Sequence, residues 1–435
     1  MGNLNAILFS YGARFFRAIL SWGLSLFILT CSQTLLPAQT LVGTITHDNF
    51  FPFAIEVYEP GNRLFVSDWG PVPSRLLVYD GQSLALLADL GPLGATPAGA
   101  LGAPHVLNGL GKVYVNVSDG DTDRVAVVDA DTLSLIRHVD LPGEGGVIGR
   151  DEVLRQVYVL IEDISHPSPE LHVLDALTDQ FIGMVPLRNA LPNFSLNPVT
   201  HALAFGYLQA DFIDVVDAAT LGVTSFPAFK TWGVDFNWVE NKVVGIGQAL
   251  GAFSLDLVTG AVTPIACSND ALLMYFNPAG NRMYTSAEVN RTSTIIEGPS
   301  DSCFLLPMYG GTDRWGFYHA ANHAYAGAVS NRPESGSRLE VAVVIDDASQ
   351  LIEQIPLRQI GRDYLPMHDI AVHQGGGRVF IASSPAGGDG QIAVIQDDGR
   401  LTRPPLYWID PGAREVHTVD PGSDTVVHSY WGNWP

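Results

Sequence analysis

The chain is poor in cysteine, in basic side chains and in long apolar runs. It contains 3 Cys, and its 23 Lys and Arg face 45 Asp and Glu, which gives a net charge of −22 at pH 7. Nucleic-acid binding depends on Lys and Arg that neutralise phosphates, and no basic run occurs in this sequence. The charge balance therefore argues against nucleic acid as a partner, and against anionic lipid surfaces for the same reason.

No stretch after the first 40 residues approaches the roughly 20 apolar residues that a membrane helix needs. Within those 40 residues, two Arg precede an apolar run over residues 18–31 and a small-residue stretch over residues 36–38. This order predicts a signal peptide over residues 1–40 and a single mature domain over residues 41–435. The mature protein is then secreted or periplasmic and has no membrane span.

Two alternatives to a cleaved signal peptide remain open. Residues 28–31 loosely resemble a lipoprotein cleavage site, so lipid anchoring at Cys31 is a less favoured possibility. A retained membrane anchor is another.

Cleavage would leave Cys267 and Cys303 as the remaining cysteines. Paired thiols in an oxidising compartment usually form a disulfide, which makes Cys267 and Cys303 disulfide candidates. Two buried free thiols are the alternative. No Cys-x-x-Cys spacing indicates a zinc site.

A repeated pattern occupies most of the mature chain. The stretch RVAVVDADTLSLIRHVDLPG, residues 124–143, alternates like a strand, breaks at an Asp corner and alternates again, and related copies start at residues 75, 170, 212 and 253. Weaker copies start at residues 294, 341 and 391, and a second strand pair precedes each copy. Four short strands repeated about every 45 residues predict an all-β fold, a β-propeller whose blades are the repeats.

The number of blades follows from counting strand pairs. Eight upstream pairs favour eight blades, with seven as the alternative. The strand at residues 41–46 could complete the last blade by ring closure, and the tail over residues 411–435 is an extra half-unit without an assigned place. A ring is expected because a single blade cannot bury both of its faces.

The units VYVNVSDGDTDRVAVVDADTLSLI and LFVSDWGPVPSRLLVYDGQSLALL resemble the YVTN-type repeat family of β-propellers, the YncE-like proteins. The repeats do not show the Gly-His and Trp-Asp pairs of the WD40 pattern. The resemblance implies a secreted or periplasmic propeller with a central funnel. Related folds include lactonase-like and quinoprotein amine dehydrogenase-like enzymes, and also proteins with no known reaction.

The corner Asp residues are predicted to be structural. An Asp before a tight turn accepts hydrogen bonds from backbone amides two residues further on, and this fixes the turn. The residues at this position are Asp80, Asp129, Asp175, Asp217, Asp256 and Asp346.

Candidate binding residues are the polar side chains that differ from unit to unit. In a propeller, the loops that enter the innermost strands and the loops that join the second and third strands open on one face, called here the funnel face. Scaffold positions recur along a repeat whereas ligand contacts need not. The candidates at the funnel are His105, Trp232, Asp235, Asp313, Arg314, His368 and Asp369.

Two classes of function fit these residues. The preferred hypothesis is a binding or interaction scaffold for a protein or small-molecule ligand. The alternative is a funnel-site enzyme, a lactonase-like hydrolase or a quinone-dependent dehydrogenase, in which His105, His368, Asp369 and Arg314 could supply a base, its carboxylate and a cation. No GxSxG, Walker or HExxH motif occurs, no local spacing supports a metal, and the sequence names no cofactor.

Overall fold

The structure, a computed structural model, describes residues 39–70, 73–94, 100–118, 123–162, 168–188, 192–247, 251–266, 273–286, 293–305, 312–331, 338–346, 351–360, 367–384, 390–397, 406–410, 415–420 and 425–431. All of them belong to the compact unit Gln39–Pro435. Every regular element among these residues is a β-strand, and in this part of the chain no helix suited to crossing a membrane is found. Cys31 and residues 1–38 lie outside the described residues, so the signal peptide stays a prediction.

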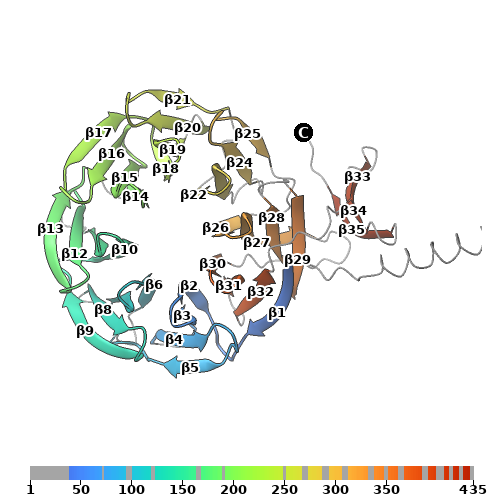
Figure 1. Cartoon of the computed structure of the whole chain (residues 1–435), viewed down its shortest axis with the longest axis horizontal. Helices are drawn as coiled ribbons and strands as arrows, with labels where there is room; N and C mark the ends of the chain where they lie inside the picture. Colours follow the sequence, from blue (N-terminus) through green and yellow to red (C-terminus); the bar gives the residue numbers. More distant parts are fainter. Residues whose placement is uncertain are drawn as a thin grey trace, which may run out of the picture. The chain divides into compact units, whose positions relative to one another are not determined.

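Eight antiparallel sheets of four strands form a ring, and each sheet is one blade of a β-propeller (Figure 1). The predicted all-β propeller with eight blades is therefore confirmed. From the innermost to the outermost strand, the blades in chain order are: blade 1, β2 (Pro52–Tyr58), β3 (Arg63–Asp68), β4 (Arg75–Asp80) and β5 (Leu86–Asp89); blade 2, β6 (Leu101–Leu107), β7 (Lys112–Ser118), β8 (Asp123–Asp129) and β9 (Ser134–Asp140); blade 3, β10 (Gly145–Asp151), β11 (Gln156–Ile161), β12 (Glu170–Asp175) and β13 (Gln180–Pro186); blade 4, β14 (Pro192–Leu196), β15 (Ala202–Tyr207), β16 (Phe212–Asp217) and β17 (Val223–Pro227); blade 5, β18 (Thr231–Asn237), β19 (Lys242–Gly247), β20 (Gly251–Asp256) and β21 (Val262–Pro264); blade 6, β22 (Leu273–Asn277), β23 (Arg282–Ser286), β24 (Thr294–Glu297) and β25 (Cys303–Leu305); blade 7, β26 (Thr312–Tyr318), β27 (His323–Asn331), β28 (Arg338–Asp346) and β29 (Leu351–Ile360); blade 8, β30 (Met367–His373), β31 (Arg378–Ser384), β32 (Gln391–Asp397) and β1 (Gln39–Ile45).

The first described strand closes the ring. β1 pairs antiparallel with β32, from Gln39 opposite Asp397 to Ile45 opposite Ile392. The outer strand of blade 8 therefore comes from the N-terminal end, as predicted for residues 41–46, while its other three strands come from residues 367–397. Closure joins blade 8 to blade 1, so both faces of every blade are covered.

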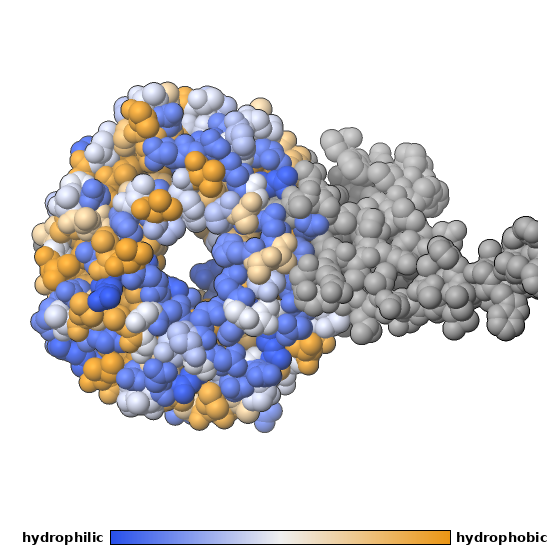
Figure 2. Space-filling view, viewed as in Figure 1, coloured by the Kyte–Doolittle hydropathy of each residue, from blue (hydrophilic) through white to orange (hydrophobic). Residues whose placement is uncertain are grey.

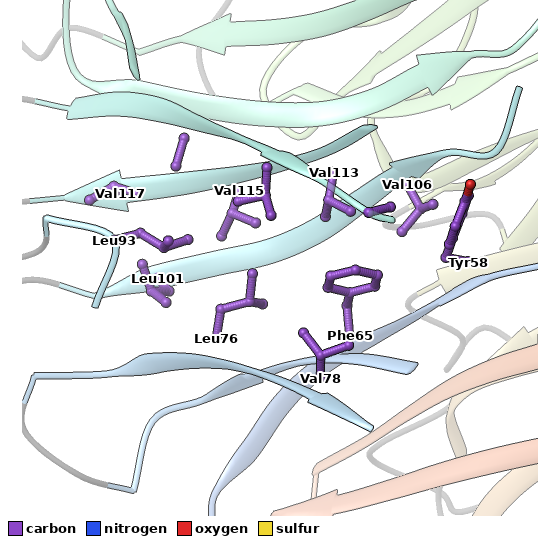
Figure 3. Close-up of a cluster of buried hydrophobic side chains, with 13 residues drawn as sticks. Tyr58, Phe65, Leu76, Val78, Leu93, Leu101, Val106, Val113, Val115 and Val117 are labelled. Atoms are coloured by element: carbon purple, nitrogen blue, oxygen red, sulfur yellow. The ribbon is translucent and has the colours of Figure 1, made fainter. Parts of the chain in front are cut away.

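Each interface between neighbouring blades holds its own apolar cluster. Figure 3 shows the cluster between blades 1 and 2, in which Phe65 of β3 faces Val113 of β7. Leu64 and Val66, the neighbours of Phe65 along β3, belong instead to the cluster between blades 8 and 1. Successive side chains of a strand point to opposite faces, so one apolar run fills two interfaces.

An Asp fixes the turn between the third and fourth strands of a blade. Oδ1 of Asp129 accepts the backbone N–H groups of Asp131 at 2.9 Å and Thr132 at 2.7 Å. The hydrogen bond from Thr132 is the largest of the effects that lower the pKa of Asp129. The same pair of backbone hydrogen bonds occurs at Asp80, Asp175, Asp217 and Asp256.

The C-terminal segment forms a sheet of its own. β33 (Leu406–Asp410), β34 (Glu415–Asp420) and β35 (Thr425–Trp431) pair antiparallel in this order. The tail over residues 411–435 thus contributes two strands to a three-stranded sheet, which is not a ninth four-stranded blade.

Candidate functional site

The innermost strand of every blade faces the centre of the ring (Figure 1). Figure 2 shows a hole at this centre, with hydrophilic residues over much of its rim. This opening is called the channel below. Side chains from different blades meet there, and the described contacts place residues of five inner strands around it, β2, β6, β10, β26 and β30.

Glu56 and Arg150 form an ion pair that spans a blade. Nη2 of Arg150 donates to Oε1 of Glu56 at 2.8 Å, and Nη1 donates to Oε2 at 3.1 Å. Glu56 lies on β2 of blade 1 and Arg150 on β10 of blade 3, so the pair passes the inner edge of blade 2. His105 lies on that inner strand, β6. Neither Glu56 nor Arg150 was among the predicted site residues.

The ion pair changes the chemistry of His105. Burial and the nearby positive charge of Arg150 lower the pKa of His105 to about 3, although a hydrogen bond with the backbone of Val147 opposes the change. Burial also raises the pKa of Glu56, against the attraction of Arg150. At neutral pH His105 is thus an uncharged imidazole, and a pKa of about 3 makes it a weak general base.

Arg314 and Asp369, two of the predicted residues, are brought together. Nη1 of Arg314 on β26 donates to Oδ1 of Asp369 on β30 at 2.7 Å. Asp369 also accepts the backbone N–H of Ile370 on its own strand and of Ile55 on β2 of blade 1. Asp369 is 4% exposed and ties blades 7, 8 and 1 to one another.

Asp235 makes a comparable tie between blades 4, 5 and 6. Its Oδ1 accepts hydrogen bonds from the Ser195 hydroxyl and from its neighbour Phe236 N–H, and its Oδ2 accepts the Phe276 N–H at 2.8 Å. Burial nevertheless raises the pKa of Asp235 to about 6. The described contacts of Asp235 are therefore those of an inter-blade support.

His368 faces away from the other predicted residues. Its Nε2 lies 3.2 Å from Oε1 of Glu340, a buried carboxylate on β28 that also accepts the Nε–H of Arg358. Burial would raise the pKa of Glu340, but the hydrogen bond from His368 and the charges of His368 and Arg358 lower it. The His368 ring lies against Gly327, where a β-carbon would come within 2.5 Å of the ring. The structure therefore does not gather His105, Arg314, His368 and Asp369 around one space.

The remaining predicted residues lie near the start of inner strands. Trp232, the second residue of β18, is 41% exposed. Asp313 lies on β26, and its side chain is outside the described part of the structure. A binding role for either residue stays a prediction.

A small cleft opens on the funnel face over blade 2, between Trp69 of blade 1 and Gly145 of blade 3. Its volume is about 190 Å³, and the indole of Trp69 on its wall stacks on Phe53 with the ring centroids 3.7 Å apart. The Nε1–H of Trp69 donates to the Leu101 carbonyl, which fixes the indole. The other residues of the wall are Ala100, Gly102, Asn116, Val117, Ser118, Asp123 and Gly145.

The opposite face carries contacts that repeat. In each blade a turn joins the first and second strands, called here the inner turn. The backbone N–H of the first residue of one inner turn donates a hydrogen bond to the side chain of the corresponding residue in the next blade. The chain of hydrogen bonds runs from His319 to Gln374, Glu59, Asn108 and Glu152. These residues are positioned by the repeat and support the ring.

The repeat carries a sequence signal for Glu56. Glu56 lies three residues before its inner turn, and so do His105, Ser195, Asp235 and Tyr275 before theirs. The same repeat position therefore holds five different polar side chains. In blade 3 this position holds Gly149, and Arg150 is the next residue along β10, so the spacing of the repeat could not predict that Arg150 reaches the channel.

Among the described residues, no group of three His, Cys, Asp or Glu side chains is arranged to hold a metal ion. Cys303 is disulfide-bonded. Cys267 lies outside the described residues, so its pairing with Cys303 stays a prediction.

Comparison with known proteins does not identify a family. No family model matches the chain, and no curated protein is similar enough in sequence to be recognised as a relative. The architecture is thus what the structure establishes, a ring of eight four-stranded blades around a polar channel.

Proposed function

We propose that this protein is an exported binding scaffold that takes up a protein or small-molecule partner through its channel and funnel face. The supporting observation is a contrast between two sets of contacts. The ties between turns, such as that of Glu59 to Asn108, recur from blade to blade. The channel side chains differ, as the neighbouring inner strands with Glu56, His105 and Arg150 illustrate.

The funnel-site enzyme is the second candidate, and the geometry favours it less. Lactone hydrolysis was expected to use His105, His368, Asp369 and Arg314 around one substrate. The pKa of His105 is lowered to about 3, which makes it a weak base, and His368 is bonded to Glu340. A quinone-dependent oxidation has no specific support among the described contacts.

Two further parts of the proposal rest on the sequence alone. Export to a secreted or periplasmic location follows from the charge and apolar pattern of residues 1–40. Membership of the YVTN-type repeat family is inferred from the repeats at residues 64–87 and 113–136. Edman sequencing of the protein recovered from outside the cytoplasm tests export, because the mature chain should begin close to Gln39. Recovery only in the cytoplasm with an intact Met1 would contradict it.

A photo-crosslinking comparison tests the binding role. A photoreactive amino acid replaces Trp232 on the funnel face in one full-length variant, and Val258, an 81% exposed residue at an outer corner of blade 5, in a control. The proposal expects a specific crosslinked species from position 232 only, in the protein's native compartment. Equal crosslinking from both positions, or none from 232, would count against the funnel face as the binding surface.

A further inference from the structure

Arg314 has hydrogen-bonding capacity that its ion pair does not use. Its contact with Asp369 is made end-on through Nη1, and its side chain is 50% exposed. Within the described residues, its Nη2 and Nε make no protein hydrogen bond. A guanidinium has five N–H donors in a fixed fork, so most of them remain available. The strong attraction of Asp369 raises the pKa of Arg314, which keeps the guanidinium charged.

Arg314 points into the channel. It acts electrostatically on Glu56 of blade 1, and also on His105 of blade 2, although blades 8 and 1 separate blade 7 from blade 2 around the ring. Arg314 can be close to both Glu56 and His105 only if its side chain lies on the channel side of the inner strands.

Arg150, the other arginine at this level, is in a different state. Both of its Nη atoms donate to Glu56, and its side chain is only 23% exposed. Its fork is therefore occupied by a protein carboxylate. Arg314 is the better anchor for a carboxylate brought by a ligand, because charge-assisted pairs between Arg and carboxylate are strong and directional.

The surroundings of Arg314 select against a simple anion. Asp369 and Glu56 lie beside it and raise the local negative potential, and Asp369 raises the pKa of Glu56. The whole chain adds a net charge of −22. A ligand that brings a positive group together with its carboxylate avoids this repulsion.

Asp369 is only 4% exposed, so a positive group can contact it only at the small part of its carboxylate that lies open beside Arg314. Its Oδ2 accepts one described hydrogen bond, from the Ile55 N–H, and a carboxylate oxygen can accept a second. Oδ1 of Asp369 lies 2.7 Å from Arg314, so the two charges are in contact. An α-amino acid has the matching arrangement, because a single carbon separates its ammonium from its carboxylate.

We infer that Arg314 and Asp369 form a binding site for a free α-amino acid, with Arg314 on the ligand carboxylate and Asp369, supported by Glu56, on the ammonium. This inference rests on the proposed binding function and names its ligand class. Glu56 is held by Arg150, and Asp369 by backbone N–H groups, so the site is fixed before a ligand arrives.

The test is saturation-transfer NMR on the mature protein, which begins close to Gln39, with three probe sets. The sets are a mixture of the standard L-amino acids, the same compounds as N-acetyl derivatives that lack the ammonium, and the same compounds as amides that lack the carboxylate. The variants are Arg314→Gln and a control, Arg188→Gln. Arg188 is 59% exposed and lies 3.8 Å from Asp214, so both substitutions remove one exposed arginine from an aspartate and change the net charge equally.

The expected result is binding of one or more free amino acids by the wild type and by Arg188→Gln, and a loss of affinity of about tenfold or more in Arg314→Gln. The amides should bind as weakly as that variant. Unchanged affinity in Arg314→Gln, or equal binding of the amides, would overturn the role of Arg314. Equal binding of the N-acetyl compounds would overturn the role of Asp369.

Two further outcomes test the inference, a folding failure of Arg314→Gln and an absence of binding by the wild type. If Arg314→Gln fails to fold, Arg314→Lys preserves the charge but not the fork, and an affinity equal to that of the wild type would contradict a forked carboxylate contact. If the wild type binds no amino acid, the ligand class is wrong. The binding function itself is judged separately by crosslinking at Trp232, which does not depend on this ligand.

Discussion

At the scale of single residues, the carboxylates of this propeller differ according to what surrounds them. Asp129 lies at a surface corner, and two backbone N–H groups stabilise its charged form and lower its pKa. Asp235 accepts a similar number of hydrogen bonds but lies between blades, where burial raises its pKa to about 6. Burial, rather than the count of hydrogen bonds, decides the direction of the change.

The corner hydrogen bonds can be tested by substitution. Asp129→Ala removes the acceptor of two backbone N–H groups and should lower the free energy of unfolding by about 1 kcal/mol. Asp129→Asn keeps an oxygen acceptor and should lose less. Asp140→Ala, at an exposed position at the end of β9, is the control and should be nearly neutral. Urea denaturation compares the variants, and equal losses at positions 129 and 140 would contradict a structural corner.

His105 should make the fold sensitive to acid. Its pKa is about 3 in the folded protein, below the ordinary value of 6.5, so between these limits the unfolded chain binds the proton and the folded protein does not. Stability from His105 is therefore complete above about pH 6.5 and is lost as pH falls toward 3, by about 1.4 kcal/mol per pH unit at most. His105→Asn should show a smaller drop in melting temperature between pH 7 and pH 4.

Asp235 should change stability with pH in the direction opposite to His105 and serves as a control. Its folded pKa of about 6 lies above the ordinary 3.8, so its contribution is present at low pH and is lost as pH rises through 6. Asp235→Asn should therefore make the acid-induced drop in melting temperature steeper. The same drop in the wild type and both variants would show that neither group governs the pH dependence.

At the scale of elements, β1 is the strand on which ring closure depends. It covers the outer edge of β32, and Ile45 at its end is buried in the cluster between blades 8 and 1. Gln39 at its other end is buried too, whereas the residues between them are partly or largely exposed, Leu41 and Val42 among them. Backbone pairing therefore contributes more to holding β1 than side-chain burial does.

Removing β1 should weaken the ring. A chain that begins at Thr46 should melt roughly 5 °C or more below a chain that begins at Gln39, because it leaves β32 with an open edge and uncovers part of the cluster around Phe50. A synthetic peptide with the sequence of Gln39–Ile45 should restore part of the difference. Equal melting temperatures would mean that the ring closes without this strand.

At the scale of the whole molecule, charge and ring geometry act together. A net charge of −22 on one chain produces repulsion between its acidic side chains. In a closed ring the blades cannot move apart to reduce this repulsion, so it lowers the stability of the fold. Ion pairs such as Arg150 with Glu56 counteract this repulsion locally.

Salt should accordingly stabilise the protein. Raising the ionic strength from about 0.01 M to about 0.5 M shortens the screening length from about 30 Å to below 8 Å, which screens the overall repulsion more than the close ion pairs. The melting temperature, measured by differential scanning fluorimetry, should rise. A fall would show that ion pairs contribute more to stability than repulsion takes away.

Much of the architecture could be predicted from spacing because a propeller repeats it. The strand pairs, the corner Asp residues and the closing strand at residues 41–46 all follow from one unit read eight times. The site was harder to predict. Arg314 and Asp369 were found because they occupy loop-proximal positions of inner strands, and His368 was included for the same reason although its ring points to Glu340. Strand alternation places neighbours such as His368 and Asp369 on different sides, and spacing alone did not reveal which side faces the channel.

The sequence by itself determined the blade, because strand alternation, the Asp corner and the turn residues are local properties of each repeat. Only the tertiary structure decided which side chains meet in the channel. Glu56 and Arg150 are 94 residues apart and two blades apart, and they touch because the ring curves their strands toward a common centre. The same curvature brings Arg150 close enough to His105 to lower its pKa and leaves Arg314 half exposed, since both outcomes depend on distances across the ring, which no local pattern encodes.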